Sequence, residues 1–342
     1  AVLLDKNADT PVPPASMSKL MTLELVFEAL ETGRLALEDS FRISERAAAM
    51  GGSKMFIRSG ESVSIEDLLR GVIVQSGNDA AVALAEAISG TEAAFADLMN
   101  QRASAIGLTN SRFSNATGWP DPEHRMSPRD LAILAERIIT LYPLHYAMFS
   151  ETEFTWDGIT QGNRNPLLSA GIGADGLKTG HTSEAGFGLV ASAQRGERRI
   201  LLVVSGLESA KQRRQESERL INWAFRAFET ARLYKAGEPV AMAEVWIGAA
   251  PEVAMAPERD LIVTVPYGML ENALITAHFA EPVDAPIEAG VMLGRLEVVL
   301  PGVTPVSVPL VAVEAVERGG VLPRLKALTR LLKLRLLAAD EG

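Results

Sequence analysis

The chain contains no cysteine among its 342 residues. Cysteine supplies catalytic thiolates, the ligands of many zinc sites and all disulfide bonds, so these three kinds of chemistry are excluded. The four histidines, His124, His145, His181 and His278, include no pair at the spacing of metal ligands. A zinc peptidase is therefore unsupported, and we expect no metal or other cofactor.

Basic residues are fewer than acidic ones, 33 against 43, which gives a formal net charge of −10. Nucleic-acid binding needs a basic face that neutralises phosphates, so we expect no nucleic-acid partner. Low-complexity tracts are also missing, and 47% hydrophobic and 22% charged residues are typical of a folded globular chain.

A long uninterrupted hydrophobic run is missing too. The longest uncharged stretch of the C-terminal third, residues 298–313, carries Pro301, Pro305 and Pro309. Because proline disrupts a helix, we predict strands and turns there rather than a membrane span. No secretory signal is visible, and the chain opens on the apolar, strand-like residues 1–4, which we interpret as the start of a mature or trimmed chain.

Helical periodicity, with apolar residues three and four positions apart, dominates the first two thirds of the chain. It predicts helices at residues 16–33, 65–88, 93–106, 128–141 and 212–230. The apolar runs 186–193 and 199–207 flank turn residues 194–197 and predict a hairpin within an antiparallel sheet. This mixture predicts an α+β first domain over residues 1–234.

After about Tyr234 the pattern becomes all-β. Short valine-rich runs alternate with Pro and Gly turns at residues 243–247, 261–265, 273–279, 291–300 and 306–313. The length also exceeds that of one typical core. We therefore predict a β-sandwich domain at residues 235–319, with the boundary near Lys235-Ala236-Gly237.

The last segment, residues 320–342, reverses the sign of the charge. From Arg324 to Arg335 there are five basic residues and no acidic one, with leucines on one helical face and Lys326, Arg330 and Lys333 on the other. Such an amphipathic helix suits an anionic membrane surface, which we expect residues 322–337 to contact. Packing of the helix on its own domain is the alternative.

Three short motifs each occur once: Ser16-Met17-Ser18-Lys19, Ser76-Gly77-Asn78 and Lys178-Thr179-Gly180. The first alone is an ordinary helix start and the second an ordinary turn. All three in this order are very unlikely to be accidental.

The first motif can activate a nucleophile. A serine hydroxyl reacts well only when a base takes its proton. With Ser16 in the first turn of a helix, Lys19 shares its face and can meet it. Lys19 must be neutral to act as the base, which burial or the nearby charge of Lys178 promotes. The helix N-terminus adds N–H groups where an oxyanion develops.

The other two motifs can form the walls of a cleft. Glycine interrupts the helical pattern at Ser76-Gly77-Asn78, which predicts a loop that lifts Ser76 and Asn78 into the cleft. Lys178-Thr179-Gly180 predicts an edge strand. A peptide substrate then pairs with this edge, and Gly180 lets its backbone approach closely.

With their flanking residues 14–19, 75–80 and 175–182, these motifs resemble the signature of penicillin-binding proteins and class A β-lactamases. They look most like the low-molecular-mass D-alanyl-D-alanine carboxypeptidases. The resemblance implies a penicillin-binding/β-lactamase-like transpeptidase domain of α/β (α+β) class, with an antiparallel sheet flanked by helices, then a small all-β domain and a C-terminal amphipathic helix.

The resemblance also implies an activity. It predicts a serine-type enzyme that removes the terminal D-alanine from peptidoglycan stem peptides through an acyl-enzyme, with β-lactams as covalent inhibitors. Its expected place is the periplasm, on the outer face of the inner membrane. Because the family has a strand before residues 1–4, we also expect an open sheet edge.

Residue roles follow from the same resemblance. Ser16 is the acylated nucleophile, Lys19 its general base, and Ser76 and Asn78 the proton relay and the substrate amide contact. On the third motif, Lys178 tunes the electrostatics and Thr179 contacts the substrate carboxylate. The backbone N–H groups of Ser16 and His181 form the oxyanion hole.

Two arginines complete the implied site. Arg213 matches an arginine that binds the free carboxylate of the terminal D-alanine, although Arg214 beside it offers a second register. Arg164 matches another arginine beside the cleft. A solvated surface charge is the alternative for both.

Three other functions remain alternatives. A class A β-lactamase needs a Glu-x-x-x-Asn element between the second and third motifs to position the deacylating water, and none occurs there. An endopeptidase of the same superfamily shares the motif chemistry. A non-catalytic wall-binding protein on this fold is disfavoured by intact Ser16, Lys19 and Lys178.

Overall fold

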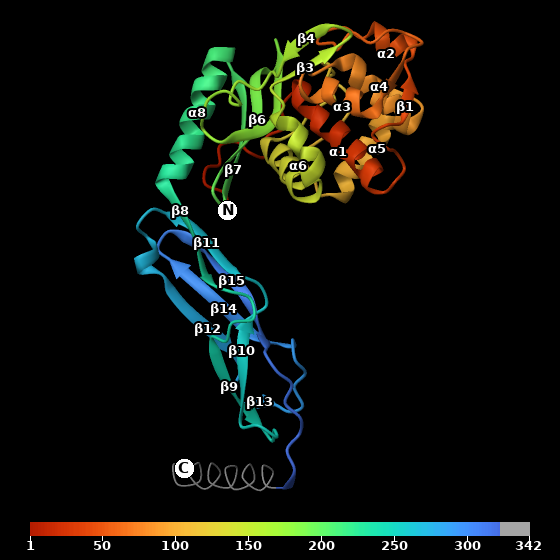
Figure 1. The fold of residues 1–342 in the computed structure, drawn as a ribbon. Coiled ribbons are helices and arrows are strands. Elements are labelled where there is room, and N and C mark those ends of the chain that lie inside the picture. The colour runs from red at the N-terminus through yellow and green to blue at the C-terminus, as the bar shows by residue number, and fades with distance from the viewer. Residues whose placement is uncertain (322–342) are drawn as a thin grey trace. The chain divides into compact units, whose positions relative to one another are not determined.

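The computed structural model describes residues 1–321. The predicted amphipathic segment 322–337 lies outside this range. The chain divides into two compact units, one of residues 2–225 and the other from residue 226 onward, whose elements are labelled in Figure 1. Among the described helices, none is long and apolar enough to cross a bilayer.

The first unit is built around α1 (Lys19–Glu31), which is buried on nearly all sides. It shares one hydrophobic core with four helices: α3 (Ile65–Ile73), α4 (Asn78–Ser89), α5 (Glu92–Ala105) and α6 (Pro128–Leu141). The smaller elements of this part are η1 (Ala15–Ser18), β1 (Ser40–Arg42), α2 (Glu45–Ala49), β2 (Ser62–Ser64), α7 (Pro143–Tyr146), η2 (Ala147–Ser150), β3 (Glu153–Trp156) and β4 (Ile159–Gly162).

Local sequence sets where these helices begin. Ser64, Thr91 and Ser127 each accept a hydrogen bond from the backbone N–H three residues later, at the starts of α3, α5 and α6. This satisfies an N–H group that has no partner within the helix. Pro128 occupies the first position of α6, where the missing N–H costs nothing.

A three-stranded antiparallel sheet in the order β5 (Ala174–Thr182), β6 (Gly186–Arg195), β7 (Arg198–Leu207) separates the helical cluster from α8 (Ala210–Ala227) (Figure 1). Alternate residues of β6 point to opposite faces. Val190 belongs to the helical core, whereas Leu189 and Ala191 pack with Ile221 of α8. Within the described part β5 is an edge strand.

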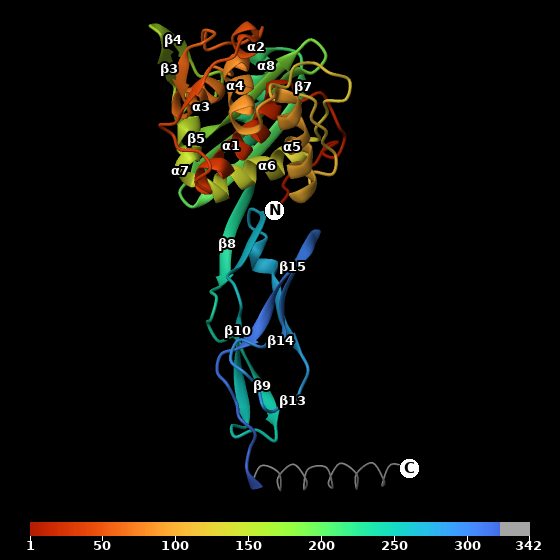
Figure 2. The same ribbon diagram turned by 90° about the vertical axis from the view of Figure 1, so that its right-hand side faces the viewer.

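The second unit is all-β. Its larger sheet has the order β12-β14-β15-β10-β9-β13, and β8 pairs with β11 in a separate two-stranded sheet. Apolar residues of both sheets, among them Val263 and Leu296, share one core. Figure 2 shows most of these strands from a second direction. The strands are β8 (Phe228–Tyr234), β9 (Ala241–Trp246), β10 (Glu252–Pro257), β11 (Leu261–Pro266), β12 (Leu274–Phe279), β13 (Val283–Asp284), β14 (Met292–Leu300) and β15 (Val303–Ala312), with the short turn η3 (Leu270–Asn272).

The fold class is confirmed, and two local predictions need correction. The predicted helix 212–230 ends at Ala227, because Phe228–Tyr234 pairs with β11 as a strand. The compact units divide at residues 225 and 226, within the last turn of α8. Residues 1–4 are not a strand, because no strand of the described part of the chain pairs with them, and the side chains of Val2 and Leu4 are exposed.

Candidate active site

Ser16 and Lys19 meet as the first motif predicts, but the local geometry differs from an α-helical turn. Ser16 lies in the 3-10 turn η1, which continues directly into α1 at Lys19. The Nζ atom of Lys19 lies 2.9 Å from the Oγ atom of Ser16. The pair thus joins a half-buried hydroxyl to a fully buried amine.

Two further oxygens surround the amine of Lys19. Its Nζ atom donates to Oδ1 of Asn78 and to the backbone carbonyl of Thr117, both at 2.7 Å. Burial lowers the pKa of Lys19 well below its usual value, the positive charge of Lys178 lowers it further, and Asp79 acts in the opposite direction. The site therefore favours the neutral amine that a general base requires.

The second motif forms a loop between α3 and α4, as predicted. Ser76 is buried there with a φ of 59°, a left-handed conformation that residues with a Cβ rarely adopt. Asn78 begins α4 and holds its amide in place by donating from Nδ2 to the carbonyl of Gly51 at 2.7 Å. Its Oδ1 atom is thereby directed to Lys19.

Lys178 of β5 connects the third motif to the second. Its Nζ atom donates to Oγ of Ser76 at 2.7 Å, and the side chain is buried. Burial lowers the pKa of Lys178 to about 7, and the positive charges of Arg164 and Arg213 act in the same direction. Three predicted residues, Ser16, Ser76 and Asn78, therefore lie around the two buried amines of Lys19 and Lys178.

Gly180 allows a close contact within the protein itself. A Cβ atom at this position would lie 2.8 Å from the carbonyl oxygen of Pro14 and 3.2 Å from Cβ of Ala15. Glycine therefore lets β5 approach the turn that carries Ser16. Neighbouring Thr179 is buried, and His181 is exposed and stacks on Phe187 at 3.9 Å between ring centroids.

The two predicted arginines differ in their surroundings. The guanidinium of Arg213 lies 5.6 Å from the ring centroid of Phe187, and its buried Nε atom has no hydrogen-bond partner among the described residues. Arg214 instead pairs with Glu218 along α8. Arg164 is exposed and donates to Gln161 at 3.2 Å. Of the three, Arg213 is the one with an unused buried donor.

Sequence reasoning missed the loop that carries Thr117. The side-chain oxygen of Asn115 accepts the N–H groups of Thr117, Gly118 and Trp119, which turns the Thr117 carbonyl toward Lys19. Gly118 is required because a Cβ there would collide with the carbonyl of Ala15. The Asn-x-x-Gly spacing signals a turn, but nothing in it indicates contact with a residue almost a hundred positions away.

Asp79 is a second residue that the motifs did not single out. Its buried carboxylate accepts the backbone N–H groups of Met55 at 3.0 Å and Phe56 at 2.9 Å. These bonds hold the segment before β2 against the start of α4. They help to position the loop that ends in Asn78.

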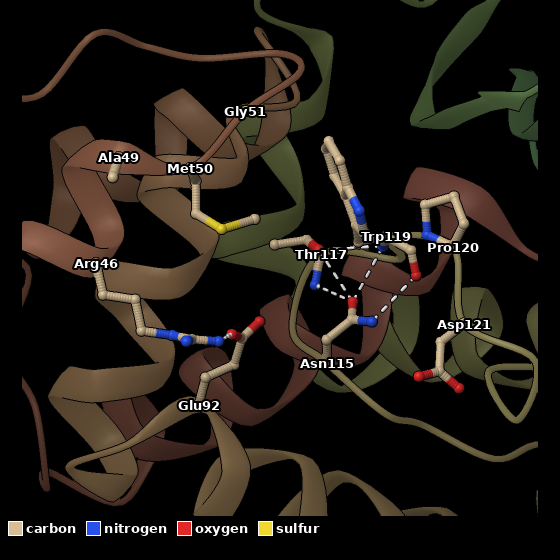
Figure 3. Close-up of a pocket in the computed structure, with 10 residues that line it drawn as sticks. All are labelled: Arg46, Ala49, Met50, Gly51, Glu92, Asn115, Thr117, Trp119, Pro120 and Asp121. Atoms are coloured by element: carbon tan, nitrogen blue, oxygen red, sulfur yellow. Dashed lines mark hydrogen bonds and ion pairs between the residues drawn. The ribbon is translucent and has the colours of Figure 1, made fainter.

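A hollow of about 490 Å³ lies beside this cluster of side chains. Gly51 and Thr117, whose carbonyls contact Asn78 and Lys19, line it. Figure 3 shows Arg46 and Met50 on the side of α2, Glu92 of α5 reaching toward Arg46, and the loop residues around Trp119 facing them. The residues that line it are Arg46, Ala49, Met50, Gly51, Glu92, Asn115, Thr117, Trp119, Pro120 and Asp121.

Sequence comparisons match both parts of the chain. Residues 1–209 match a family described as D-alanyl-D-alanine carboxypeptidase, and residues 228–318 match the C-terminal domain of penicillin-binding protein 5. The D-alanyl-D-alanine carboxypeptidase DacC of Escherichia coli is 39% identical, over 94% of this chain and 83% of that protein. The carboxypeptidase DacF of Bacillus subtilis is 34% identical, over 95% and 85%.

Solved structures agree with these matches. Penicillin binding protein 5 from Haemophilus influenzae has a TM-score of 0.86 at 38% identity, covering 93% of this chain and 94% of that one. Penicillin-binding protein D2 from Listeria monocytogenes, in its ampicillin-bound form, has a TM-score of 0.60 at 30% identity and covers 66% and 92%. The chain thus belongs to the D-alanyl-D-alanine carboxypeptidase family of low-molecular-mass penicillin-binding proteins.

Proposed function

We propose that this protein is a serine-type D-Ala-D-Ala carboxypeptidase that cleaves peptidoglycan stem peptides through an acyl-enzyme on Ser16. One observation carries the assignment. A neutral lysine amine has two hydrogens and one lone pair, and Lys19 faces two carbonyl oxygens, of Asn78 and Thr117, and one hydroxyl, of Ser16. The two carbonyls can only accept, so the lone pair is left for the hydroxyl proton of Ser16.

Acylation follows from this arrangement. Oγ of Ser16 attacks the carbonyl carbon of the penultimate D-alanine while its proton passes to Nζ of Lys19. The oxyanion that forms is stabilised by the backbone N–H groups of Ser16 and His181. When the peptide bond breaks, the proton held by Lys19 passes through the hydroxyl of Ser76, which Lys178 contacts at 2.7 Å, to the leaving D-alanine amine, and Lys19 becomes neutral again. Water then attacks the ester and gives a proton to Lys19, which returns it to Oγ of Ser16 as the ester bond breaks.

Arg213 binds the terminal carboxylate of the substrate. The unpartnered, buried Nε of Arg213 supports this role, because an unsatisfied buried donor is costly and a carboxylate would satisfy it. Lys178 and Thr179 lie on β5. The positive charge of Arg213 lowers the pKa of Lys178, so the two cationic side chains act on the same part of the site. A requirement for the free carboxylate would make the enzyme a carboxypeptidase rather than an endopeptidase.

Replacement of Arg213 by Ala should lower kcat/KM for diacetyl-L-Lys-D-Ala-D-Ala by about 10–100-fold, mostly through KM, because a charge-assisted hydrogen bond contributes about 1.5–3 kcal/mol. D-Alanine release is measured, and cleavage of the C-terminally amidated peptide is the comparison. Arg214→Ala is the matched control, since Arg214 pairs with Glu218. Equal losses in both variants, or equal cleavage of acid and amide by the wild type, would contradict the role of Arg213.

The family membership also supports acylation by β-lactams, since a penicillin-binding relative was solved with ampicillin bound. No glutamate-led element of the β-lactamase kind lies between the second and third motifs. We therefore expect the penicilloyl ester to be long-lived and β-lactams to act as inhibitors.

We place the protein outside the cytoplasm, at the outer face of the inner membrane, with its C-terminal segment as the membrane contact. Its five basic residues and its leucine face support binding of residues 322–337 to an anionic bilayer.

Truncation after Gly320 should reduce cosedimentation with phosphatidylglycerol-containing vesicles by at least about tenfold, since each basic residue near the surface contributes about 1 kcal/mol. Neutral phosphatidylcholine vesicles are the control, and unchanged binding after truncation would refute the anchor.

A further inference from the structure

The loop of the second motif and the strand of the third motif are joined at a second place, in addition to the contact between Lys178 and Ser76. The segment of residues 163–165, between β4 and β5, makes this connection. On one side, the backbone N–H of Arg164 donates to the carbonyl of Val74 at 3.3 Å. Val74 follows α3 directly and lies two residues before Ser76. The segment is thereby attached to the chain that leads into the second motif.

Asn165 makes the bond on the other side. Its side chain is only 4% exposed, and its Nδ2 atom donates to the carbonyl of Gly176 at 2.9 Å. Gly176 belongs to β5 and lies two residues before Lys178. The loop and the strand therefore share one contact at their catalytic residues and a second connection two residues earlier in each chain segment.

The amide of Asn165 is itself held in one orientation. Its Oδ1 atom accepts the N–H of Leu167 at 3.0 Å, so Nδ2 is the atom that faces Gly176. The backbone N–H of Asn165 donates to Oδ1 of Asn163 at 2.9 Å. Asn163 in turn donates from Nδ2 to the carbonyl of Glu151 at 2.8 Å. The bond to β5 thus starts from a segment that is anchored elsewhere.

The start of β5 is also packed from another direction. A Cβ atom at Gly176 would lie 2.8 Å from the hydroxyl oxygen of Tyr146. That hydroxyl donates to the carboxylate of Asp175 at 2.7 Å, and Arg199 donates to the same carboxylate at 2.7 Å. The beginning of the strand is therefore fixed by Tyr146 and by Asn165 together.

The segment of Asn165 also carries a charge that acts on Lys178. Burial lowers the pKa of Lys178 to about 7, and the positive charges of Arg164 and Arg213 act in the same direction. The side chain of Arg164 is exposed and donates to Gln161. Because the interaction of two charges weakens with their separation, the effect of Arg164 depends on how closely its segment is held to β5.

We propose that Asn165 is a positioning residue, which ties the strand of Lys178 to the segment of Arg164 and thereby holds Lys178 in contact with Ser76. This inference rests on the proposed function, in which Ser76 relays a proton and Lys178 supplies a positive charge. Asn165 acts through these side chains and takes no part in bond cleavage.

Asn165→Ser is the first variant that tests this role. A serine hydroxyl at this position can still accept the N–H of Leu167, as serine does in similar turns, but is too short to reach Gly176. We expect kcat for D-alanine release from diacetyl-L-Lys-D-Ala-D-Ala to fall by about tenfold, because misplacement of a catalytic group by about 1 Å costs up to about 10²-fold. Asn165→Ala removes both bonds and should give at least the same loss.

The pH profile of kcat/KM is the second readout. On its alkaline side kcat/KM falls as Lys178 loses the charge that attracts the substrate carboxylate. A pKa that a neighbouring cation lowers rises when this cation is held less closely, so Asn165→Ser should move the alkaline limb to higher pH by about half a pH unit or more. Lys19 is unchanged in every variant, so the difference between variants reports the surroundings of Lys178.

Two further variants separate positioning from stability. Asn163→Ala is the matched control, since it removes the bond to Glu151 from the same segment but keeps the side chain of Asn165. It should lower the midpoint of thermal unfolding and leave the alkaline limb in place. Arg164→Gln should itself move the limb to higher pH, and adding Asn165→Ser to it should move the limb little further, because both changes act through one charge.

The outcomes distinguish this inference from the function on which it rests. If the wild type releases no D-alanine, both are overturned. If the wild type is active and Asn165→Ser keeps its kcat and its alkaline limb, the carboxypeptidase assignment stands and the positioning role is overturned. The role is overturned as well if Asn163→Ala moves the limb as far as Asn165→Ser does.

Discussion

Ser16→Ala should abolish covalent labelling by penicillin and lower kcat for D-alanine release by at least about 10⁴-fold. Loss of a catalytic nucleophile costs on this order or more, because the remaining groups have no atom to acylate. Labelled penicillin and intact-protein mass spectrometry measure the adduct, and a D-alanine assay measures turnover.

Ser18→Ala is the control for this variant. Ser18 lies in the same 3-10 turn and is fully buried, yet its Oγ makes no hydrogen bond within the described structure. We expect Ser18→Ala to keep its labelling. Persistent labelling of Ser16→Ala at another residue would sink the proposed mechanism.

Lys19→Met should lower the rate of acylation by penicillin by about 10²–10⁴-fold, the usual contribution of a general base. Methionine fills similar space without an amine, so Ser16 keeps its position and loses its proton acceptor. The variant leaves the carbonyls of Asn78 and Thr117 without a donor, which costs about 1–3 kcal/mol for each group. Thermal unfolding measures that loss separately from the chemistry.

The pH dependence gives Lys19→Met a second readout. Burial and Lys178 hold the pKa of Lys19 below its usual value, and the amine works as a base only when it is unprotonated. Wild-type acylation should therefore fall as the pH drops through that lowered pKa. In Lys19→Met this limb should vanish, and a variant that kept it at full rate would show that another group is the base.

The charge of Lys178 couples the protonation of Lys178 to that of Lys19. Its pKa of about 7 means that it is charged below neutral pH and largely neutral above it. Its charge disfavours protonation of Lys19, whereas binding of a substrate carboxylate favours protonation of Lys178. The two amines therefore titrate as a coupled pair, and an apparent pKa from kinetics belongs to both.

The sequence alone determined the chemistry of this protein to a large extent. Ser16, Lys19, Ser76, Asn78 and Lys178 stand in short motifs whose residue types serve one reaction, and the structure brings all five together. Helices with clear periodicity and caps, such as α6, were predictable because local patterns decide where they begin and which face they bury.

Only the tertiary structure decided which distant groups complete the site. The carbonyl of Thr117 meets Lys19 across 98 positions of sequence, and no local pattern encodes a contact between segments so far apart. The same holds for Gly180, whose missing side chain makes room for the turn of Ser16, and for residues 228–230, which were predicted to end a helix and instead begin β8 and pair with β11. The lowered pKa of Lys19 likewise arises from complete burial, which depends on how the whole unit packs and not on its motif.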